Sequence, residues 1–219
     1  METYIVRLWL ADRPGALGQV ATRIGGVRGD VVGIEILERG GDRVVDELVV
    51  SLPEPDLVDL LVAEIGQVDG VAVESVRRLD DERHDPGVWA LDLGADLVAA
   101  GAPGPMFQRL ADEVTRCMAT DWVTVLDLRR ATAVVSAGDG SPSSAWLAAY
   151  IEGSRHLGPT AVDHGPQDIA WSLLDGSDLV LAVGRKGHPI RWRERRQLAG
   201  LARIAAGLVP LWSSVVPVP

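Results

Sequence analysis

The hydrophobic pattern of the first part of the chain alternates between the short period of a strand and the longer period of a helix. Residues 4–10 form an apolar, β-branched run that predicts a buried strand. After a polar turn, apolar residues recur at the spacing of one helix face: Leu17, Val20, Ala21 and Ile24. Gly25-Gly26 is expected to end this helix, because glycine often follows a helix end.

The next segment predicts a β-hairpin. Val32, Ile34 and Ile36 alternate with the residues between them, so we expect a strand with one face mostly buried. The Gly40-Gly41-Asp42 sequence provides the tight turn, and residues 43–52 provide the returning strand.

A second helix and a fourth strand complete this pattern. Residues 53–56 end the hairpin and open the helix, whose buried face is expected to contain Leu57, Leu60, Leu61 and Ile65. Residues 71–78 form the last strand. The β-α-β-β-α-β order predicts an α+β, ferredoxin-like domain, with four antiparallel strands and both helices on one face of the sheet.

The chain is expected to contain two domains. Residues 1–79 form the first, the polar segment 80–88 is a linker, residues 89–210 form the second, and 211–219 are a C-terminal tail. In the second domain we expect helices over 89–100, 107–118, 143–154 and 192–208, and strands over 122–128, 133–137, 169–174 and 179–185. This pattern predicts another α+β domain, with an antiparallel sheet flanked by helices.

Composition narrows the classes of function. The 219 residues carry a formal net charge of −10, which disfavours direct binding to nucleic acid. Cys117 is the only cysteine, so no internal disulfide can form. The start of the chain does not read as a secretory signal, and no apolar run reaches the ~20 residues of a membrane span. We therefore expect a cytoplasmic protein that does not bind membranes.

The turn at residues 12–17, Asp-Arg-Pro-Gly-Ala-Leu, is the strongest indication of function. It joins a strand to a helix start, where free backbone N–H groups lie beside a carboxylate, an arrangement that suits a small polar ligand. Asp12 either caps the helix alone or also contacts a ligand. Gly15 is expected to be structural in both cases, and Asp30 is either a ligand contact or a turn residue.

In this element order, the turn and the Asp30–Ile36 segment resemble an ACT domain over residues 3–78. The resemblance implies a homodimer that binds an amino acid between the first strand–helix turn and the start of the second strand. The residues that it assigns to ligand binding are Asp12, Arg13, Pro14, Gly15, Ala16, Leu17, Asp30, Val31 and Val32.

Two of these positions depart from the pattern of the family. Asp12 and Asp30 stand where amino-acid-binding members often have asparagine. An amide both donates and accepts hydrogen bonds, whereas an ionised carboxylate only accepts them. The aspartates therefore favour an ammonium group. A ligand carboxylate would be held by Arg13 or by the N–H groups of Ala16 and Leu17.

The second half is similar, less distinctly, to GAF- or PAS-like domains. The resemblance rests on two strands, a turn and a long final helix within Asp168–Ala205. It implies a domain that binds a small effector or serves only for dimerisation. Trp122, Trp146 and Trp171 are expected to pack in the core. The arginine-rich segment at 191–203 is interpreted as a solvated helix start rather than an anion site.

No catalytic residue, metal site or cofactor is predicted. Asp46 and Glu47 adjoin in a strand and should face opposite sides, so they cannot act on one substrate. The four histidines lack the spacing of metal ligands. We expect a non-enzymatic, amino-acid-responsive regulatory protein that acts as a homodimer. The alternatives are a ligand-free scaffold and an enzyme whose active site lies in the second domain.

Overall fold

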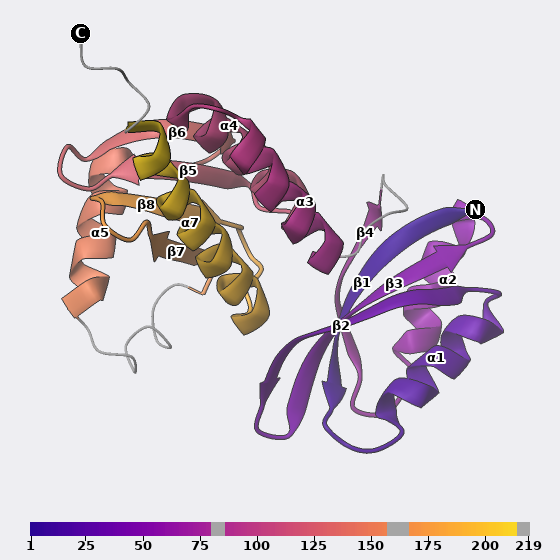
Figure 1. Ribbon diagram of the computed structural model, residues 1–219. Coiled ribbons are helices and arrows are strands. Elements are labelled where there is room, and N and C mark those ends of the chain that lie inside the picture. The colour runs from indigo at the N-terminus through magenta and orange to yellow at the C-terminus, as the bar shows by residue number, and fades with distance from the viewer. Residues whose placement is uncertain (80–85, 157–166, 214–219) are drawn as a thin grey trace, which may run out of the picture. The chain divides into compact units, whose positions relative to one another are not determined.

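The computed structural model describes residues 1–79, 86–156 and 167–213 (Figure 1). The chain divides into two compact units, Met1–Asp85 and Pro86–Pro219. Most of the expected linker at 80–88 lies outside the described residues, but Pro86 already begins a helix. No helix of the described residues is long and apolar enough to cross a membrane.

The first unit has the predicted α+β order. Its elements are β1 (Glu2–Ala11), α1 (Ala16–Gly26), β2 (Asp30–Gly40), β3 (Arg43–Leu52), the 3₁₀ turn η1 (Pro55–Leu57), α2 (Val58–Ile65) and β4 (Ala72–Leu79). The four strands lie in the order β2-β3-β1-β4, and every neighbouring pair is antiparallel. Both helices lie on the same side of this sheet (Figure 1). The ferredoxin-like prediction is confirmed.

Alternation along β1 and β3 builds the core beneath the helices. Tyr4, Val6, Leu8 and Leu10 are buried on one face of β1, as strand geometry requires of every second residue. They pack in one cluster with buried residues of both helices, namely Val20, Ile24, Leu61 and Ile65. The inner strands therefore hold the helices in place, and the turn between β1 and α1 is anchored at both ends.

Four residues that were predicted to be buried in this unit are exposed. Val32, Ile34 and Ile36 are 58%, 53% and 38% exposed, because β2 is an edge strand and the core forms over β1 and β3. Leu60 is 47% exposed. The η1 turn delays the start of α2 to Val58, and the helix buries Leu61 and Ile65 of the predicted face but not Leu60.

The neighbouring carboxylates of β3 do face opposite sides. Glu47 pairs in register with Arg7, and the guanidinium Nη2 of Arg7 lies 2.8 Å from the Glu47 Oε2 atom. Both side chains are buried. Asp46 pairs in register with Leu8, a residue of the helix-side core. The two carboxylates are therefore on different faces and cannot share a substrate.

The second unit is a three-layer arrangement around another antiparallel sheet. Its elements are α3 (Pro86–Ala99), α4 (Pro103–Cys117), β5 (Trp122–Asp127), β6 (Thr132–Gly138), α5 (Ser144–His156), β7 (Ile169–Leu173), β8 (Leu179–Gly184) and α7 (Trp192–Ser213). The strand order is β6-β5-β8-β7. One face packs in a single cluster with α3, α4 and α7, and the opposite face packs with α5 (Figure 1). The predicted sheet with flanking helices is confirmed.

Local signals place several of these elements correctly. The Ser143 hydroxyl accepts a hydrogen bond from the Trp146 N–H at 3.3 Å, so a serine starts α5 as expected.

Two other predictions for this unit differ from the structure. Trp122 is buried, but Trp146 is 48% exposed and stacks on Tyr150, so its predicted core position is wrong. The last helix continues to Ser213, beyond the predicted start of the tail at residue 211.

The arginine-rich segment is not simply a solvated helix start. Arg185 and Arg191 are both buried. The guanidinium of Arg185 donates to both carboxylate oxygens of Glu194 at 2.9 Å, and the N–H of Arg191 donates to Glu194 Oε2 at 2.7 Å. Glu194 thus joins the end of β8 to the start of α7. Arg193 and Arg196 remain exposed.

Candidate functional site

The turn between β1 and α1 depends on a glycine in a left-handed conformation. Gly15 is the N-cap residue of α1, with φ of 87°. An added Cβ at this position would meet nothing within 4 Å, so the backbone conformation and not crowding requires glycine here. No side chain caps the helix, and the expectation that Asp12 does so is wrong. The chain reaches α1 through Gly15, which leaves the exposed Asp12 carboxylate unused as a cap.

The backbone of the turn is tied to the neighbouring hairpin. The Asp12 N–H donates to the carbonyl of Asp42 at 2.8 Å, and the Arg13 N–H donates to that of Ala11 at 2.8 Å. The Ala16 N–H makes a longer bond to Arg13, at 3.3 Å. Leu17 follows in the first helical turn, where N–H groups have no partner within the helix. The turn is therefore fixed and presents a donor.

Arg13 lies over the turn, although its side chain is exposed. Its Nη2 atom donates to Gln19 Oε1 at 3.3 Å and approaches the Asp69 carbonyl at 3.5 Å. A shallow hollow of about 330 Å³ beside it is lined by Gln19, Thr22, Arg23, Gln67, Val68 and Asp69. None of the predicted ligand-binding residues lines this hollow, so it does not extend the predicted site.

Asp30 lies at the opposite end of the sheet from Asp12 within one chain. β1 and β2 both pair antiparallel with β3, so they run in the same direction. Asp30 is in register with Ser51, and Ser51 is in register with Thr3, at the start of β1. Eight residues at ~3.3 Å each separate that level from Ala11, a distance of about 26 Å. One chain therefore does not bring Asp12 together with Asp30, Val31 and Val32.

Asp46 is a site residue that the sequence interpretation missed. Its side chain is 5% exposed, and its Oδ1 atom has no hydrogen-bond partner. Burial raises the pKa of this carboxyl above its ordinary value; the Arg39 guanidinium lowers the pKa, and the Asp12 carboxylate raises it. Asp46 therefore lies within electrostatic reach of the turn. Asp46 is in register with Leu8 and Ile36, which places it on the helix side of the sheet. This register is known only once the strand pairing is known, so the sequence alone did not indicate the residue.

The turn thus has the chemistry to hold a small polar molecule. Asp12 provides an exposed carboxylate, Asp46 provides a buried one with a free oxygen, and the α1 N-terminus provides N–H donors. Nothing at the turn combines a nucleophile with a base. The arrangement is suited to a ligand that carries an ammonium group close to a hydrogen-bond acceptor.

No protein-family profile and no curated protein sequence matches this chain. Solved structures match parts of it. One is an unknown protein from Galdieria sulphuraria, at 15% identity, with 45% of this chain and 63% of that chain covered and a TM-score of 0.33. The chain therefore spans less than two thirds of that structure.

Two shorter structures match about a third of the chain. The ACT domain from GTP pyrophosphokinase of Chlorobium tepidum is 19% identical, with 36% of this chain and 100% of that chain covered and a TM-score of 0.29. An ACT domain protein from Streptococcus pneumoniae is 18% identical, with 35% and 89% covered and a TM-score of 0.29. These likenesses concern the fold of part of the chain.

Proposed function

We propose that the first unit is an ACT-like module that forms a homodimer and binds an amino acid at the dimer interface. The strand register is the observation that carries the proposal. If two β2 strands pair antiparallel, the start of one lies beside the end of the other. Gly40 at that end is in register with Arg43, and Arg43 with Ala11. The Asp30 of a second copy is then at the same end of the sheet as the Asp12 turn.

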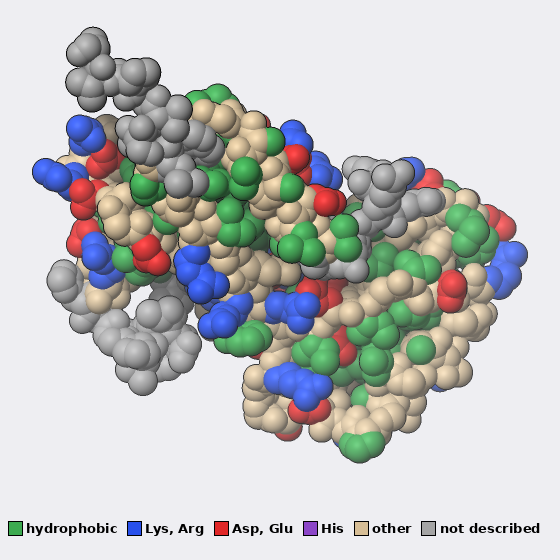
Figure 2. All heavy atoms as spheres, in the orientation of Figure 1, with side chains coloured by type: hydrophobic (Ala, Val, Ile, Leu, Met, Phe, Trp, Pro, Cys, Tyr) green, Lys and Arg blue, Asp and Glu red, His purple; other side chains and the backbone are tan. Residues whose placement is uncertain are grey.

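The free edge of β2 is suited to this pairing. It is 11 residues long and carries three exposed apolar side chains, Val32, Ile34 and Ile36. Figure 2 shows hydrophobic side chains at the surface over the strands of this unit. An unpaired apolar edge is prone to aggregation unless another strand covers it. Because one copy pairs with the other by twofold symmetry, the same contact would protect both edges.

The ligand chemistry follows from the charges at the turn. An ammonium group would be held by the exposed carboxylate of Asp12 and by Asp30 of the second copy, and the buried Asp46 carboxyl would favour it through its negative charge. A ligand carboxylate would accept from the Leu17 N–H at the positive end of α1. Arg13 would contribute if it left Gln19, its partner in the single chain. A zwitterionic α-amino acid carries both groups on the same carbon atom.

The module would act as a regulatory unit and not as an enzyme. A ligand bound between two copies stabilises one arrangement of the dimer, and so shifts the population towards it. The second unit, which we interpret as GAF-like from its antiparallel sheet between helical layers, would respond to that shift. This coupling requires that the ligand binds one arrangement more tightly than the other.

A thermal-shift screen against the protein amino acids tests the proposal. We expect at least one of them to raise the melting temperature by about 5 °C at saturation. Asp12→Ala should remove the shift, whereas Asp59→Ala, which alters an exposed carboxylate on α2, should keep it. If no amino acid raises the melting temperature, the first unit is a scaffold and the binding proposal is wrong.

A further inference from the structure

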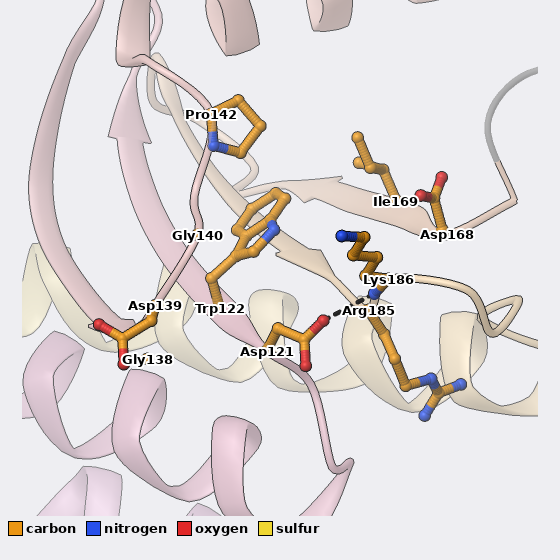
Figure 3. Close-up of a pocket in the computed structure, with 10 residues that line it drawn as sticks. All are labelled: Asp121, Trp122, Gly138, Asp139, Gly140, Pro142, Asp168, Ile169, Arg185 and Lys186. Atoms are coloured by element: carbon orange, nitrogen blue, oxygen red, sulfur yellow. Dashed lines mark hydrogen bonds between the residues drawn. The ribbon is translucent and has the colours of Figure 1, made fainter. Parts of the chain in front are cut away.

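The second unit contains a cavity that none of the preceding sites uses. It has a volume of about 610 Å³ and lies at the ends of β5, β6 and β8 (Figure 3). Its lining comes from the start of β5, the loop after β6, the start of β7 and the residues after β8: Asp121, Trp122, Gly138, Asp139, Gly140, Pro142, Asp168, Ile169, Arg185 and Lys186. Four segments that are distant in sequence therefore meet around one space.

Two glycines fix the tryptophan in this cavity. Trp122 is in register with Gly138 on one neighbouring strand and with Gly184 on the other. A Cβ on Gly184 would collide with the Trp122 ring, and a Cβ on Gly138 would collide with the Asp121 carbonyl. Trp122 is only 6% exposed, so its ring is held rigidly with one edge at the cavity. The ring is therefore preorganised as a wall of the cavity.

Two hydrogen-bond donors face the same space without a partner. In Figure 3 the Lys186 ammonium and the Trp122 indole nitrogen point towards each other across the cavity. Within the described part of the chain, neither side chain makes a hydrogen bond or ion pair. Arg185 does not compete, because its guanidinium is turned away and bound to Glu194. Lys186 is also the only lysine in the sequence, where every other basic residue of the Lys/Arg class is arginine.

The rest of the lining limits what those donors would bind. Pro142 and Ile169 supply apolar walls above and opposite the indole ring (Figure 3). Three carboxylates, Asp121, Asp139 and Asp168, also line the cavity, and Asp121 accepts a hydrogen bond from the Lys186 backbone at 2.7 Å. They do not form a cluster that could hold a metal ion among the residues described. Their negative charge disfavours ligands with two or more negative charges.

We propose that this cavity binds a small monocarboxylate with a flat apolar body. The carboxylate accepts from the Lys186 ammonium and the Trp122 N–H, and the apolar body lies between Pro142, Ile169 and the indole ring. The one negative charge of such a ligand pairs with the Lys186 ammonium. The three carboxylates repel any anion, and a second negative charge on the ligand would have no cation to pair with, because Arg185 is bound to Glu194. The site is separate from the amino-acid site of the first unit and does not depend on it.

The single lysine makes a direct test possible. An amine-acylating reagent has two targets in this chain, Lys186 and the N-terminal amine of Met1, which is 82% exposed and serves as the internal control. Modification of each is followed by peptide mass spectrometry in the presence of benzoate. Benzamide and benzylamine, which have the same ring without the negative charge, are the matched controls. We expect benzoate to slow acylation of Lys186 about tenfold at ten times its Kd, and not that of Met1.

Two variants locate the binding. Trp122→Phe keeps an aromatic, though smaller, ring and removes the N–H, and Lys186→Gln removes the charge from an exposed side chain without disturbing the core. Titration calorimetry with benzoate should show about tenfold weaker binding for Lys186→Gln and weaker binding for Trp122→Phe. Equal slowing of Lys186 and Met1, equal protection by benzamide, or unchanged benzoate affinity in Lys186→Gln would each overturn the proposal.

Discussion

Replacement of Ile34 by lysine tests the proposed β2 pairing. Ile34 is 53% exposed in the single chain, at the middle of an unpaired edge strand. Complete burial of an isoleucine side chain is worth about 1.5–3 kcal/mol. About half of that surface remains to be buried, so each copy contributes about 1 kcal/mol to the dimer. By twofold symmetry the total is about 2 kcal/mol, or roughly a 30-fold change in the dimer Kd.

The lysine adds a further cost, because two ammonium groups would be desolvated near the twofold axis. We therefore expect Ile34→Lys to weaken dimerisation by at least about 30-fold. Sedimentation equilibrium over a range of concentrations measures this directly. Leu91→Lys is the control, since Leu91 is 77% exposed and lies on α3 in the other unit. A dimer of wild-type affinity in Ile34→Lys, or dissociation caused by Leu91→Lys instead, would refute the reasoning.

Three further predictions concern stability and are measured by urea unfolding with tryptophan fluorescence. Glu194→Gln should cost about 3 kcal/mol, because it leaves the buried Arg185 guanidinium without its charged partner; a change below about 0.5 kcal/mol would contradict the proposed role of this pair. Gly15→Ala should destabilise by about 1 kcal/mol through its φ of 87°, whereas Gly18→Ala in the same helix should stabilise; the opposite order would show that Gly15 is not constrained. Because burial raises the folded-state pKa of Asp46, its contribution to stability is present below the ordinary aspartate pKa and is lost as pH rises through the raised value. Asp46→Asn should therefore be more stable than wild type at neutral pH by about 1 kcal/mol, with the difference disappearing at acid pH; an equal difference at every pH would exclude ionisation as the cause.

The element order of both units could be predicted because its signals are local. Alternation in β1, the helical spacing in α1, and glycine or proline turns between elements each depend on a few adjacent residues. The class of each sheet followed from that order. For the same reason the opposite orientations of Asp46 and Glu47 were predictable, since they require only the period of a strand.

The burial of a strand face and the assembly of a site were not predictable in this way. Val32, Ile34 and Ile36 have the pattern of a half-buried strand, but their exposure depends on β2 lying at the sheet edge. The pairing of Arg185 with Glu194 depends on the geometry of the chain between β8 and α7. Trp122 and Lys186 line the same cavity only because β5 and β8 are neighbours in the sheet.

The predicted ligand site shows both limits together. The sequence pointed to the turn at Asp12–Leu17, and the structure confirms a helix start there with a left-handed glycine. The pairing of that turn with Asp30 is not met within one chain, because β1 and β2 run in the same direction. Strand direction relative to a third strand is a long-range property, and no local pattern contains it.

A mixing experiment with two variants tests the composite site most directly. Asp12→Ala and Asp30→Ala are prepared separately, and binding of the amino acid that gives the largest thermal shift is measured by titration calorimetry. Each variant alone should fail to bind. After subunit exchange, half of the dimers are mixed and each mixed dimer has one intact site, so about a quarter of the wild-type sites should return. If mixing restores no binding while both variants remain dimeric, the site does not span two copies of the chain and the central claim is contradicted.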